Sequence, residues 1–312
     1  MNVFGTVPSR RLGRSLGINI IPHKTCSYDC VYCQLGRTCK LTSERKTFYK
    51  PEDVFNEVKK KIDLLNKSRE KIDYLTFVSQ GEPTLDINLA KTIDLLKGFN
   101  IKIAVITNSS LIQYKEVREL LNKADWVSLK IDTIREDWWK RINRPCDKLD
   151  LGKILEGIIA FAKTYDKILT TETMIVKNLN DKEEDIISLA DFLKEVNPQK
   201  AYISIPIRPP AEKWVEKPDE EVIIMTYHLL REKVSSVEYL TGYEGNSFVS
   251  TGNIKEDLLA ITSLHPMKEI TVKKLLSMKD AGWYIIEELL RDKVLLKTPY
   301  KGENFYIKRY SE

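Results

Sequence analysis

Three closely spaced cysteines are the residues in this sequence whose types and spacing point most directly to chemistry. Cys26, Cys30 and Cys33 form a C-x3-C-x2-C pattern directly after a short apolar run. Three thiolates on one loop can bind three irons of a four-iron cluster and leave the fourth iron without a protein ligand, whereas ferredoxin-type clusters use four cysteines. An open iron can be chelated by a molecule that carries an amine and a carboxylate. The pattern therefore predicts an iron–sulfur cluster with one open coordination position.

The remaining cysteines leave zinc as the alternative metal. With Cys39 and Cys146 the chain has five cysteines, and an odd number with three in eight residues does not indicate a disulfide framework. A zinc ion bound by the three clustered thiolates and by Cys39 or His23 would also use such a spacing. Zinc ribbons usually pair two C-x2-C knuckles, and the sequence has no second knuckle, which favours iron.

Short β-branched runs alternate with helical patterns between residues 17 and 207 and must position these cysteines. Six strands, each followed by a helix, indicate parallel crossovers and an α/β fold. The loops after the strand ends are then the expected place for chemistry, as in barrel folds, and the cysteines follow the first strand. The expected strands are 17–22, 73–79, 102–107, 126–132, 168–176 and 201–207, and the expected helices are 51–67, 91–98, 114–123, 151–165, 181–196 and, after the last strand, 219–233.

The sequence pattern changes after residue 207, which predicts a second, smaller unit. Helical patterns at 254–264, 270–279 and 283–291, followed by strand-like runs at 294–298 and 304–309, fit a winged helix-turn-helix. We therefore expect one domain at 1–240 and another at 241–312. The candidate third helix is acidic where a groove-reading helix would be basic. This favours protein contact or domain docking over nucleic-acid binding for the second unit.

Charge and hydropathy narrow the class of protein. The net charge is +5, and residues 1–46 hold eight Lys or Arg against two acidic residues, so the positive excess lies at the amino end. Such an excess indicates an anionic partner, with a solvated basic face as the alternative. The longest uncharged stretch, 103–114, has 12 residues, whereas a membrane-spanning helix needs ~20. We expect a cytoplasmic protein with no membrane association and no signal peptide.

The cysteine loop at the end of a first βα strand closely resembles that of the radical S-adenosylmethionine (SAM) superfamily. The resemblance implies a partial (β/α)6 TIM-like barrel that carries one [4Fe–4S] cluster and binds SAM by its methionyl end at the open iron. It also implies a one-electron donor of the flavodoxin or ferredoxin type. That electron cleaves SAM to methionine and a 5′-deoxyadenosyl radical, which abstracts a hydrogen atom, while the barrel positions the cofactor.

The same resemblance assigns cofactor contacts to particular strand ends. In Gln80-Gly81-Glu82, the last two residues match the Gly-Gly-Glu stretch that binds the amino group of SAM, and Gln80 replaces its first glycine. The structural alternative for Gly81 and Glu82 is an ordinary strand-to-helix turn. For Lys130 and Asp132 it is a surface salt pair, and for Tyr32 it is a tyrosine of the hydrophobic core. The further implied contacts are Asn108 and Ser109 to the ribose, Lys130 and Asp132 to the carboxylate and ribose, and Tyr32 to the adenine.

Three segments, 4–37, 137–145 and 203–212, resemble a subgroup of archaeal and bacterial radical SAM proteins that is grouped with the tRNA-wyosine synthases. This resemblance implies an enzyme that modifies tRNA. Wyosine synthases also hold a second cluster on cysteines, and Cys39 and Cys146 are too few for three further ligands. An enzyme acting on a protein or small molecule, with the C-terminal unit docking a partner, is the alternative. An electron carrier or zinc-held binding module is the third interpretation.

The basic amino end predicts where an anionic substrate would bind. Arg10, Arg11 and Arg14 lie near the cysteine loop in sequence, so we expect them to rim the mouth of the barrel and bind phosphates of tRNA or another polyanion. Arg208, at the end of the sixth strand, would meet a carboxylate or phosphate there, or would only pin the turn that follows it. Further basic residues expected to contribute are Lys24, Arg37 and Lys40 near the loop, and Lys297, Lys301, Lys308 and Arg309 on the wing.

Overall fold

The computed structural model describes residues 3–9, 11–67, 71–240, 254–263, 266–277 and 280–309. An eight-stranded sheet in the order β1-β2-β5-β6-β7-β8-β9-β10 forms its centre. Neighbouring strands are parallel from β2 to β10, whereas β1 runs antiparallel to β2. This is the α/β architecture with a mostly parallel sheet that the sequence predicts. The strands are β1 (Val3–Ser9), β2 (Gly13–Ile18), β5 (Tyr74–Phe77), β6 (Lys102–Thr107), β7 (Trp126–Lys130), β8 (Ile168–Met174), β9 (Lys200–Ser204) and β10 (Val237–Tyr239).

The two edge strands, β1 and β10, are not predicted from the sequence. β1 contains Gly5 and Pro8, residue types that are depleted in strands, although proline is tolerated at a sheet edge. β10 has three residues and so gives little periodic signal. The first expected strand, 17–22, is also displaced, because pairing with β1 begins at Gly13. Residues 19–22 instead form a largely buried loop that leads to the cysteines.

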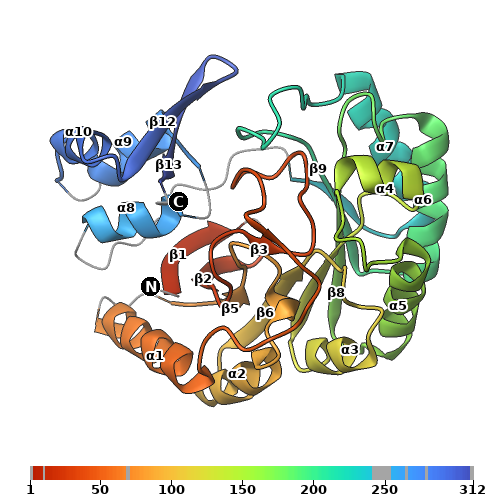
Figure 1. The fold of residues 1–312 in the computed structure, drawn as a ribbon, viewed down its shortest axis with the longest axis horizontal. Coiled ribbons are helices and arrows are strands. Elements are labelled where there is room, and N and C mark those ends of the chain that lie inside the picture. The colour runs from red at the N-terminus through yellow and green to blue at the C-terminus, as the bar shows by residue number, and fades with distance from the viewer. Residues whose placement is uncertain are drawn as a thin grey trace.

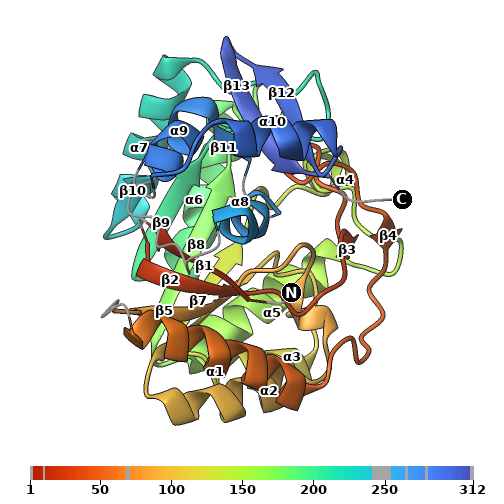
Figure 2. The same cartoon turned by 90° about the vertical axis from the view of Figure 1, so that its left-hand side faces the viewer.

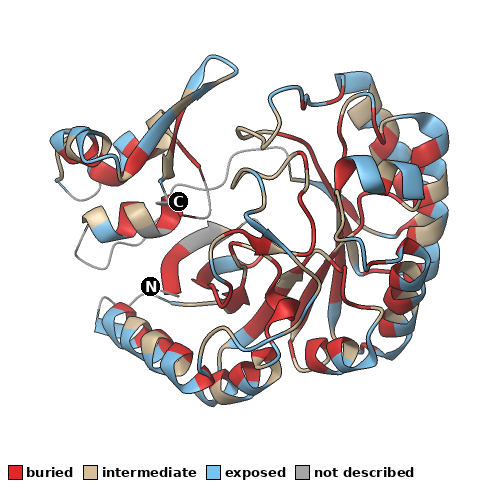
Figure 3. Cartoon of the chain, in the orientation of Figure 1, coloured by how far each residue is buried: buried red, intermediate tan, exposed pale blue. Residues whose placement is uncertain are grey.

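Helices cover the outer face of the curved sheet (Figure 1). α1 shows why they pack there: its buried residues Val54, Val58, Ile62 and Leu65 recur every three or four positions along one side. Figure 3 shows the same division, with buried residues toward the sheet and exposed residues outward. None of the helices in the described ranges is both long and apolar enough to cross a membrane. The helices are α1 (Pro51–Lys67), α2 (Leu89–Leu96), α3 (Lys115–Leu121), α4 (Glu136–Ile142), α5 (Leu151–Thr164), α6 (Glu183–Val196) and α7 (Glu220–Lys233), with short 3-10 turns η1 (Pro83–Leu85) and η2 (Lys97–Phe99).

Three helices and a small sheet form the C-terminal unit, by which we mean the described residues from 254 to 309. Its sheet has the order β11-β13-β12, and β12 and β13 form the long hairpin seen in Figures 1 and 2. The expected helices and hairpin strands agree with the observed elements to within about two residues, as is usual for element ends. The elements are α8 (Ile254–Thr262), β11 (Met267–Lys268), α9 (Glu269–Ser277), α10 (Tyr284–Arg291), β12 (Leu295–Tyr300) and β13 (Glu303–Lys308).

The C-terminal unit packs against the edge of the main sheet. Phe4 of β1 belongs to the hydrophobic core of this unit, and Leu35 and Val78 pack against that core. Asp257 of α8 also forms an ion pair with Lys61 of α1 at 3.7 Å. The first strand and the cysteine loop therefore both contribute to the seat of the C-terminal unit. The expected domain boundary at 240/241 adjoins residues outside the described ranges and stays a prediction.

Candidate active site

The cysteine loop is clamped between the end of β5 and the end of α4. On one side, the Lys24 amide donates to the Gln80 carbonyl at 2.9 Å and the Glu82 amide donates to the Thr25 carbonyl at 3.3 Å. On the other side, the Asp29 and Val31 amides donate to backbone carbonyls at the end of α4, each at 2.9 Å. Cys26, on the short strand β3 (Thr25–Cys26) that pairs with β4 (Lys40–Leu41), begins the triplet, and all three cysteines are partly buried.

Gly81 is required by this clamp. A Cβ atom at this position would lie 1.7 Å from the Thr25 carbonyl oxygen, which is far inside van der Waals contact. The glycine is therefore explained by the close approach of the cysteine loop, whereas the family resemblance explains it by the approach of SAM. The two explanations are compatible, since the loop and the strand end meet at the same place.

Each cysteine sulfur of the triplet lies next to a side-chain N–H donor. Lys24 Nζ lies 3.2 Å from Cys33 Sγ. Asn143 Nδ2 lies 3.4 Å from Cys30 Sγ, and Asn108 Nδ2 lies 3.5 Å from Cys26 Sγ. These donors come from three separate parts of the chain, and each would stabilise a thiolate over a thiol.

The three sulfurs suit a metal cluster better than free thiols. Burial raises the pKa of the Cys30 thiol to about 12 and also raises the pKa of Cys26. Thiolates at these positions therefore need a cationic partner, and bound iron deprotonates a thiol outright. Within the described ranges, no three His, Cys, Asp or Glu side chains are grouped so that they could hold one metal ion. In a four-iron cluster each thiolate binds a different iron.

Glu82 joins the end of β5 to the end of β6. Its carboxylate is 1% exposed and accepts hydrogen bonds from the Thr84 amide at 3.0 Å, the Thr107 hydroxyl at 2.6 Å and the Asn108 amide at 2.7 Å. Burial raises its pKa despite these donors. Glu82 therefore fixes the backbone of Asn108, whose side chain donates to Cys26. Ser109 follows with a left-handed backbone (φ 66°), and its buried hydroxyl has no partner among the described atoms.

The partly buried Tyr32 and the buried Asp132 and Asn143 form a second hydrogen-bonded group beside the cysteine loop. The Tyr32 hydroxyl donates to Asp132 Oδ2, and Asn143 Nδ2 donates to the same oxygen at 2.7 Å. The Met174 amide donates to Asp132 Oδ1 at 2.9 Å. Burial and the Asp132 charge raise the pKa of Tyr32 well above its usual value. Lys130 and Asp132 do form an ion pair, at 3.9 Å, but this pair is not at the surface, because Asp132 is 4% exposed.

A cavity of about 340 Å³ extends along the concave face of the sheet. Tyr32 and Cys33 of the cysteine loop line this cavity, and so does Arg11. Arg208 also borders it and donates to Gln34 Oε1 at 2.7 Å. Most of the remaining wall is apolar, so the cavity could exclude water from a reacting molecule.

Glu172 holds two cations at the floor of this cavity. Arg11 donates to its Oε2 at 2.6 Å, Lys130 donates to its Oε1 at 3.0 Å, and Ser204 donates to Oε1 at 3.1 Å. Burial alone would raise the pKa of Glu172, but the charges of Lys130 and Arg11 hold it well below its usual range. The Lys130 ammonium also lies 5.0 Å from the centre of the Tyr32 ring, which connects the floor to the cysteine loop.

The arginine rim expected at the mouth of the cavity stays a prediction. Arg11 lines the cavity and donates to Glu172, and Arg14 is the second residue of β2, where its amide donates to Asp73 Oδ2 at 2.9 Å. The strand from Arg14 to Ile18 is about 13 Å long at 3.3 Å per residue, and the cysteine loop lies beyond its other end. Lys24 is buried rather than on a rim. Arg10 lies outside the described residues.

Other cations do lie beside the cysteine loop. Arg37 bonds Asp29 at 2.6 Å and Glu212 at 3.0 Å, and Arg144 bonds Glu212 at 2.6 Å. The Glu212 amide donates to the Val31 carbonyl between Cys30 and Cys33. The loop between β9 and α7 is thereby fastened directly to the cysteine loop.

Sequence reasoning missed the roles of three residues that organise the site, Gln80, Asn143 and Glu172, and it expected Lys24 on a basic rim, whereas this residue is buried. Asn143 and Glu172 act across the sheet, so local patterns carry no signal for them. Gln80 had a signal, because it departs from the glycine of the family pattern. Its amide donates to the Ser263 carbonyl of the C-terminal unit at 3.2 Å, and it hydrogen-bonds His23 before the cysteines.

The sequence of this chain is similar to known proteins over nearly its whole length. Residues 20–190 match the family model of the radical SAM superfamily. The UPF0026 protein MJ1312 of Methanocaldococcus jannaschii is 51% identical over 307 residues, covering 98% of this chain and 95% of that protein. A probable dual-specificity RNA methyltransferase RlmN of Dictyoglomus turgidum is 24% identical over 194 residues, covering 58% and 56%.

Solved structures share the fold. A radical SAM methyltransferase from Sphaerobacter thermophilus superposes with a TM-score of 0.57 at 14% identity, over 72% of this chain and 66% of that chain. TYW1 with a bound lysine-pyruvate adduct superposes with a TM-score of 0.52 at 16% identity, over 71% and 74%. At these identities the likeness extends to the fold alone.

Proposed function

The chain belongs to the radical SAM superfamily, and from this premise we propose that it modifies RNA, with tRNA as the expected substrate. As a member it is an enzyme that uses a [4Fe–4S] cluster and SAM. When bound, these groups supply a one-electron reduction that cleaves SAM and yields a radical able to remove a hydrogen atom from the substrate. The RNA substrate is the part of the proposal that needs its own argument.

We assign the cluster to Cys26, Cys30 and Cys33. The clamp on both sides of the loop fixes the three sulfurs, and the N–H donor on each one favours the thiolate that iron needs. The open iron would then face the end of the cavity that Cys33 borders.

The SAM contacts follow from the strand ends next to that loop. Gly81 and Glu82 end β5, and Asn108 and Ser109 end β6, so their backbone groups lie beside the cysteines. The unpartnered Ser109 hydroxyl is a candidate ligand donor. On the other side, Asp132 and Lys130 end β7, and Tyr32 lies between them and the cluster loop. These residues would orient the cofactor, and the apolar wall would keep water away from it.

An exposed tryptophan on the loop that is hydrogen-bonded to the cysteine loop is the observation that carries the RNA proposal. Trp214 is 52% exposed and lies in the loop that Glu212 fastens to the cysteine loop. Lys213 and Lys217 beside it are exposed, and no ion pair is formed by either of them within the described ranges. Proteins that recognise unpaired RNA bases stack them on aromatic rings next to basic side chains. The tryptophan and lysines would hold a base at the entrance of the cavity.

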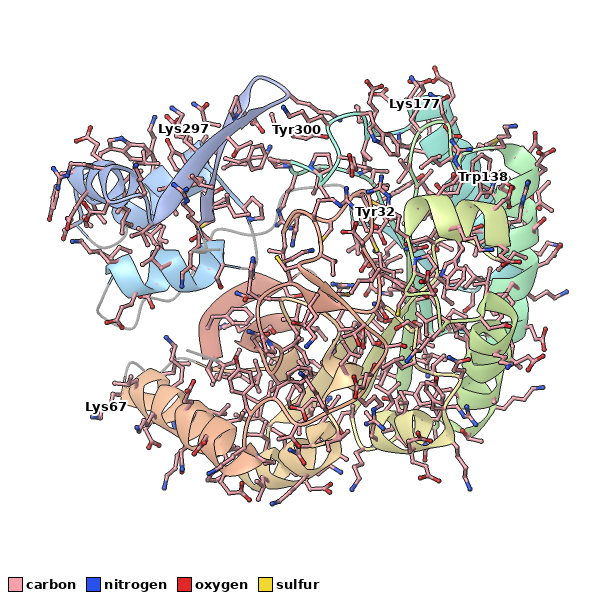
Figure 4. All side chains as sticks on the ribbon, viewed as in Figure 1. Tyr32, Lys67, Trp138, Lys177, Lys297 and Tyr300 are labelled. Atoms are coloured by element: carbon pink, nitrogen blue, oxygen red, sulfur yellow. The ribbon has the colours of Figure 1, made fainter. Side chains whose placement is uncertain are left out.

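The C-terminal hairpin approaches the same entrance. The Tyr300 hydroxyl of β12 donates to the Pro206 carbonyl at 3.4 Å, and in Figure 4 this side chain lies between the hairpin and the upper loops of the sheet. We propose that this unit is winged-helix-like and that Lys301 at the hairpin turn adds to the basic entrance. Lys301 lies near enough to Lys217 that burial and this second charge both lower its pKa.

A lysine-pyruvate adduct like the one named for the TYW1 structure is not part of this proposal. A lysine that condenses with a carbonyl group must lose its proton first. Among the described residues, Lys130 is the lysine that lines the cavity; burial alone would lower its pKa, but its pairing with Glu172 raises it. Lys130 is therefore held as a charged ammonium in its ion pair with Glu172 and is not available to condense with a carbonyl group.

A protein partner is the second candidate, favoured by one observation. Ile270 on α9 and Tyr284 on α10 are large apolar side chains that are 57% and 65% exposed. Exposed apolar residues of this kind mark protein contacts, and α10 is too acidic for a nucleic-acid groove.

RNA binding at the entrance is testable by fluorescence anisotropy with unmodified tRNA across a salt series. Trp214→Ala should weaken binding about 5- to 160-fold, because base stacking on an aromatic ring contributes about 1–3 kcal/mol. Lys213→Ala with Lys217→Ala should reduce the slope of log affinity against log salt by about one for each phosphate that the variant no longer binds. Arg14→Ala, at the opposite edge of the sheet, is the matched control and should bind as wild type.

Two results would overturn the RNA proposal. One is wild-type protein with no affinity for tRNA at low salt, and the other is a Trp214→Ala variant that binds as tightly as wild type. Either would put the protein-partner candidate first. Mass spectrometry of bulk tRNA from cells with and without the gene would then identify the modified nucleoside or show that none depends on this protein.

A further inference from the structure

Lys24 is a buried lysine that the chain holds in an unfavourable backbone conformation. It is 3% exposed and its φ is 52°, the left-handed region that residues with a Cβ rarely adopt. Its amide donates to the Gln80 carbonyl at 2.9 Å, and its own carbonyl accepts from the Cys39 and Lys40 amides, each at 3.0 Å. Strained positions persist where the surroundings determine them several times over, and they concentrate at functional sites.

The Lys24 ammonium has a cysteine sulfur as its partner. Its Nζ lies 3.2 Å from Cys33 Sγ, and no carboxylate in the described ranges forms an ion pair with it. A buried ammonium is costly without a counter-charge, because water no longer solvates it. Of the three donors to the cysteine sulfurs, Lys24 is the charged one, whereas Asn108 and Asn143 are neutral amides.

We propose that Lys24 is the counter-charge of the iron–sulfur cluster and that its ammonium raises the reduction potential of the cluster. This inference rests on the proposed assignment of Cys33 as a cluster ligand. A [4Fe–4S]2+ core with three thiolates carries a net charge of −1, and one electron from a reduced flavodoxin- or ferredoxin-type donor changes it to −2. No proton moves and no bond is formed. A positive charge next to a ligand sulfur stabilises the more negative state, which favours reduction.

The test is a potentiometric titration of the anaerobically reconstituted protein, with the reduced cluster measured by electron paramagnetic resonance. Lys24→Met should lower the equilibrium constant for one-electron reduction at least tenfold, which corresponds to a potential about 59 mV more negative. Lys40→Met, an exposed lysine on the same loop, is the matched control and should change that constant less than twofold. Lys24→Arg keeps the charge and should restore most of the wild-type value.

A second variant covers the case in which Lys24→Met does not retain the cluster. Lys24→Gln keeps an N–H donor to the sulfur without the charge, so it separates the hydrogen bond from the electrostatic effect. If Lys24→Gln and Lys24→Met bind iron as wild type and keep the equilibrium constant for reduction within twofold, Lys24 is structural and the inference is wrong. If wild-type protein binds no iron, the assignment of the cysteines fails instead. tRNA affinity, measured on the same variants, should stay at the wild-type value.

Discussion

Replacing Glu172 with glutamine tests whether the floor of the cavity is structural or contacts substrate. The carboxylate holds Arg11 at 2.6 Å and Lys130 at 3.0 Å, and the exposed fractions of the Arg11, Lys130 and Glu172 side chains are 17%, 20% and 15%. Removing one partner of a buried ion pair costs about 3–5 kcal/mol, because the other charge is left without compensation. Since these groups retain some solvent contact, we expect Glu172→Gln to lower the free energy of unfolding by about 2–4 kcal/mol at pH 7.

The assay is urea unfolding followed by circular dichroism, with Ser204→Ala as the matched control. That variant removes one hydrogen bond to the same carboxylate and should cost about 0.5–1.5 kcal/mol. The pKa of Glu172 is depressed in the folded protein, so its stabilisation is fully present above its ordinary value of 4.5 and is lost as the pH falls below it. The gap between wild type and Glu172→Gln should therefore shrink in acid. A loss below about 1 kcal/mol at pH 7, or a gap independent of pH, would refute the reasoning and release Arg11 for substrate binding.

Three further changes have expected outcomes. Cys30→Ala should abolish binding of about four irons per chain, whereas Cys39→Ala should retain it, as measured by iron content after anaerobic purification. Gln80→Leu removes the hydrogen bond to the C-terminal unit, so hydrogen exchange of the α8 amides should quicken several-fold while exchange in α5 stays unchanged. Burial raises the pKa of Asp86 to about 6, so protonation favours the folded state and stability falls as the pH rises from 3.8 to 6. Asp86→Asn should therefore unfold with about 1–3 kcal/mol more free energy at pH 7, and with no gain near pH 4.

The interior of the fold was predictable because its signals are local. The five inner strands from β5 to β9 fall within or almost within the expected runs, and the one-sided apolar spacing of helices such as α1 is visible in the sequence. The two edge strands of the sheet were not predictable, and the reason is physical. An edge strand pairs on one side and carries glycine or proline without penalty, so β1 and the three-residue β10 leave no periodic pattern.

In the candidate site, too, some residues were predictable from local sequence signals and others were not. Parallel strands end at one edge of a sheet, so Glu82, Asn108 and Asp132 were expected near the cysteines, and the structure brings them there. The partners that complete their hydrogen bonds come from residues distant in sequence. Glu172, for example, meets Arg11 across 161 positions, and no pattern within a window of the chain predicts that pair.

Gln80 shows how a departure from a family pattern can be more informative than agreement with it. At the neighbouring position the cysteine loop leaves no room for any side chain, so Gly81 keeps the family residue. One residue earlier there is room, and a glutamine connects the Ser263 carbonyl of the C-terminal unit to His23 at the start of the cysteine loop. Leu35 of the cysteine loop and Val78, which follows β5, also pack against the hydrophobic core of this unit. A displacement of the C-terminal unit by a bound partner would therefore be felt first at the strand end and loop that hold the cofactors, because these are the segments on which the unit rests.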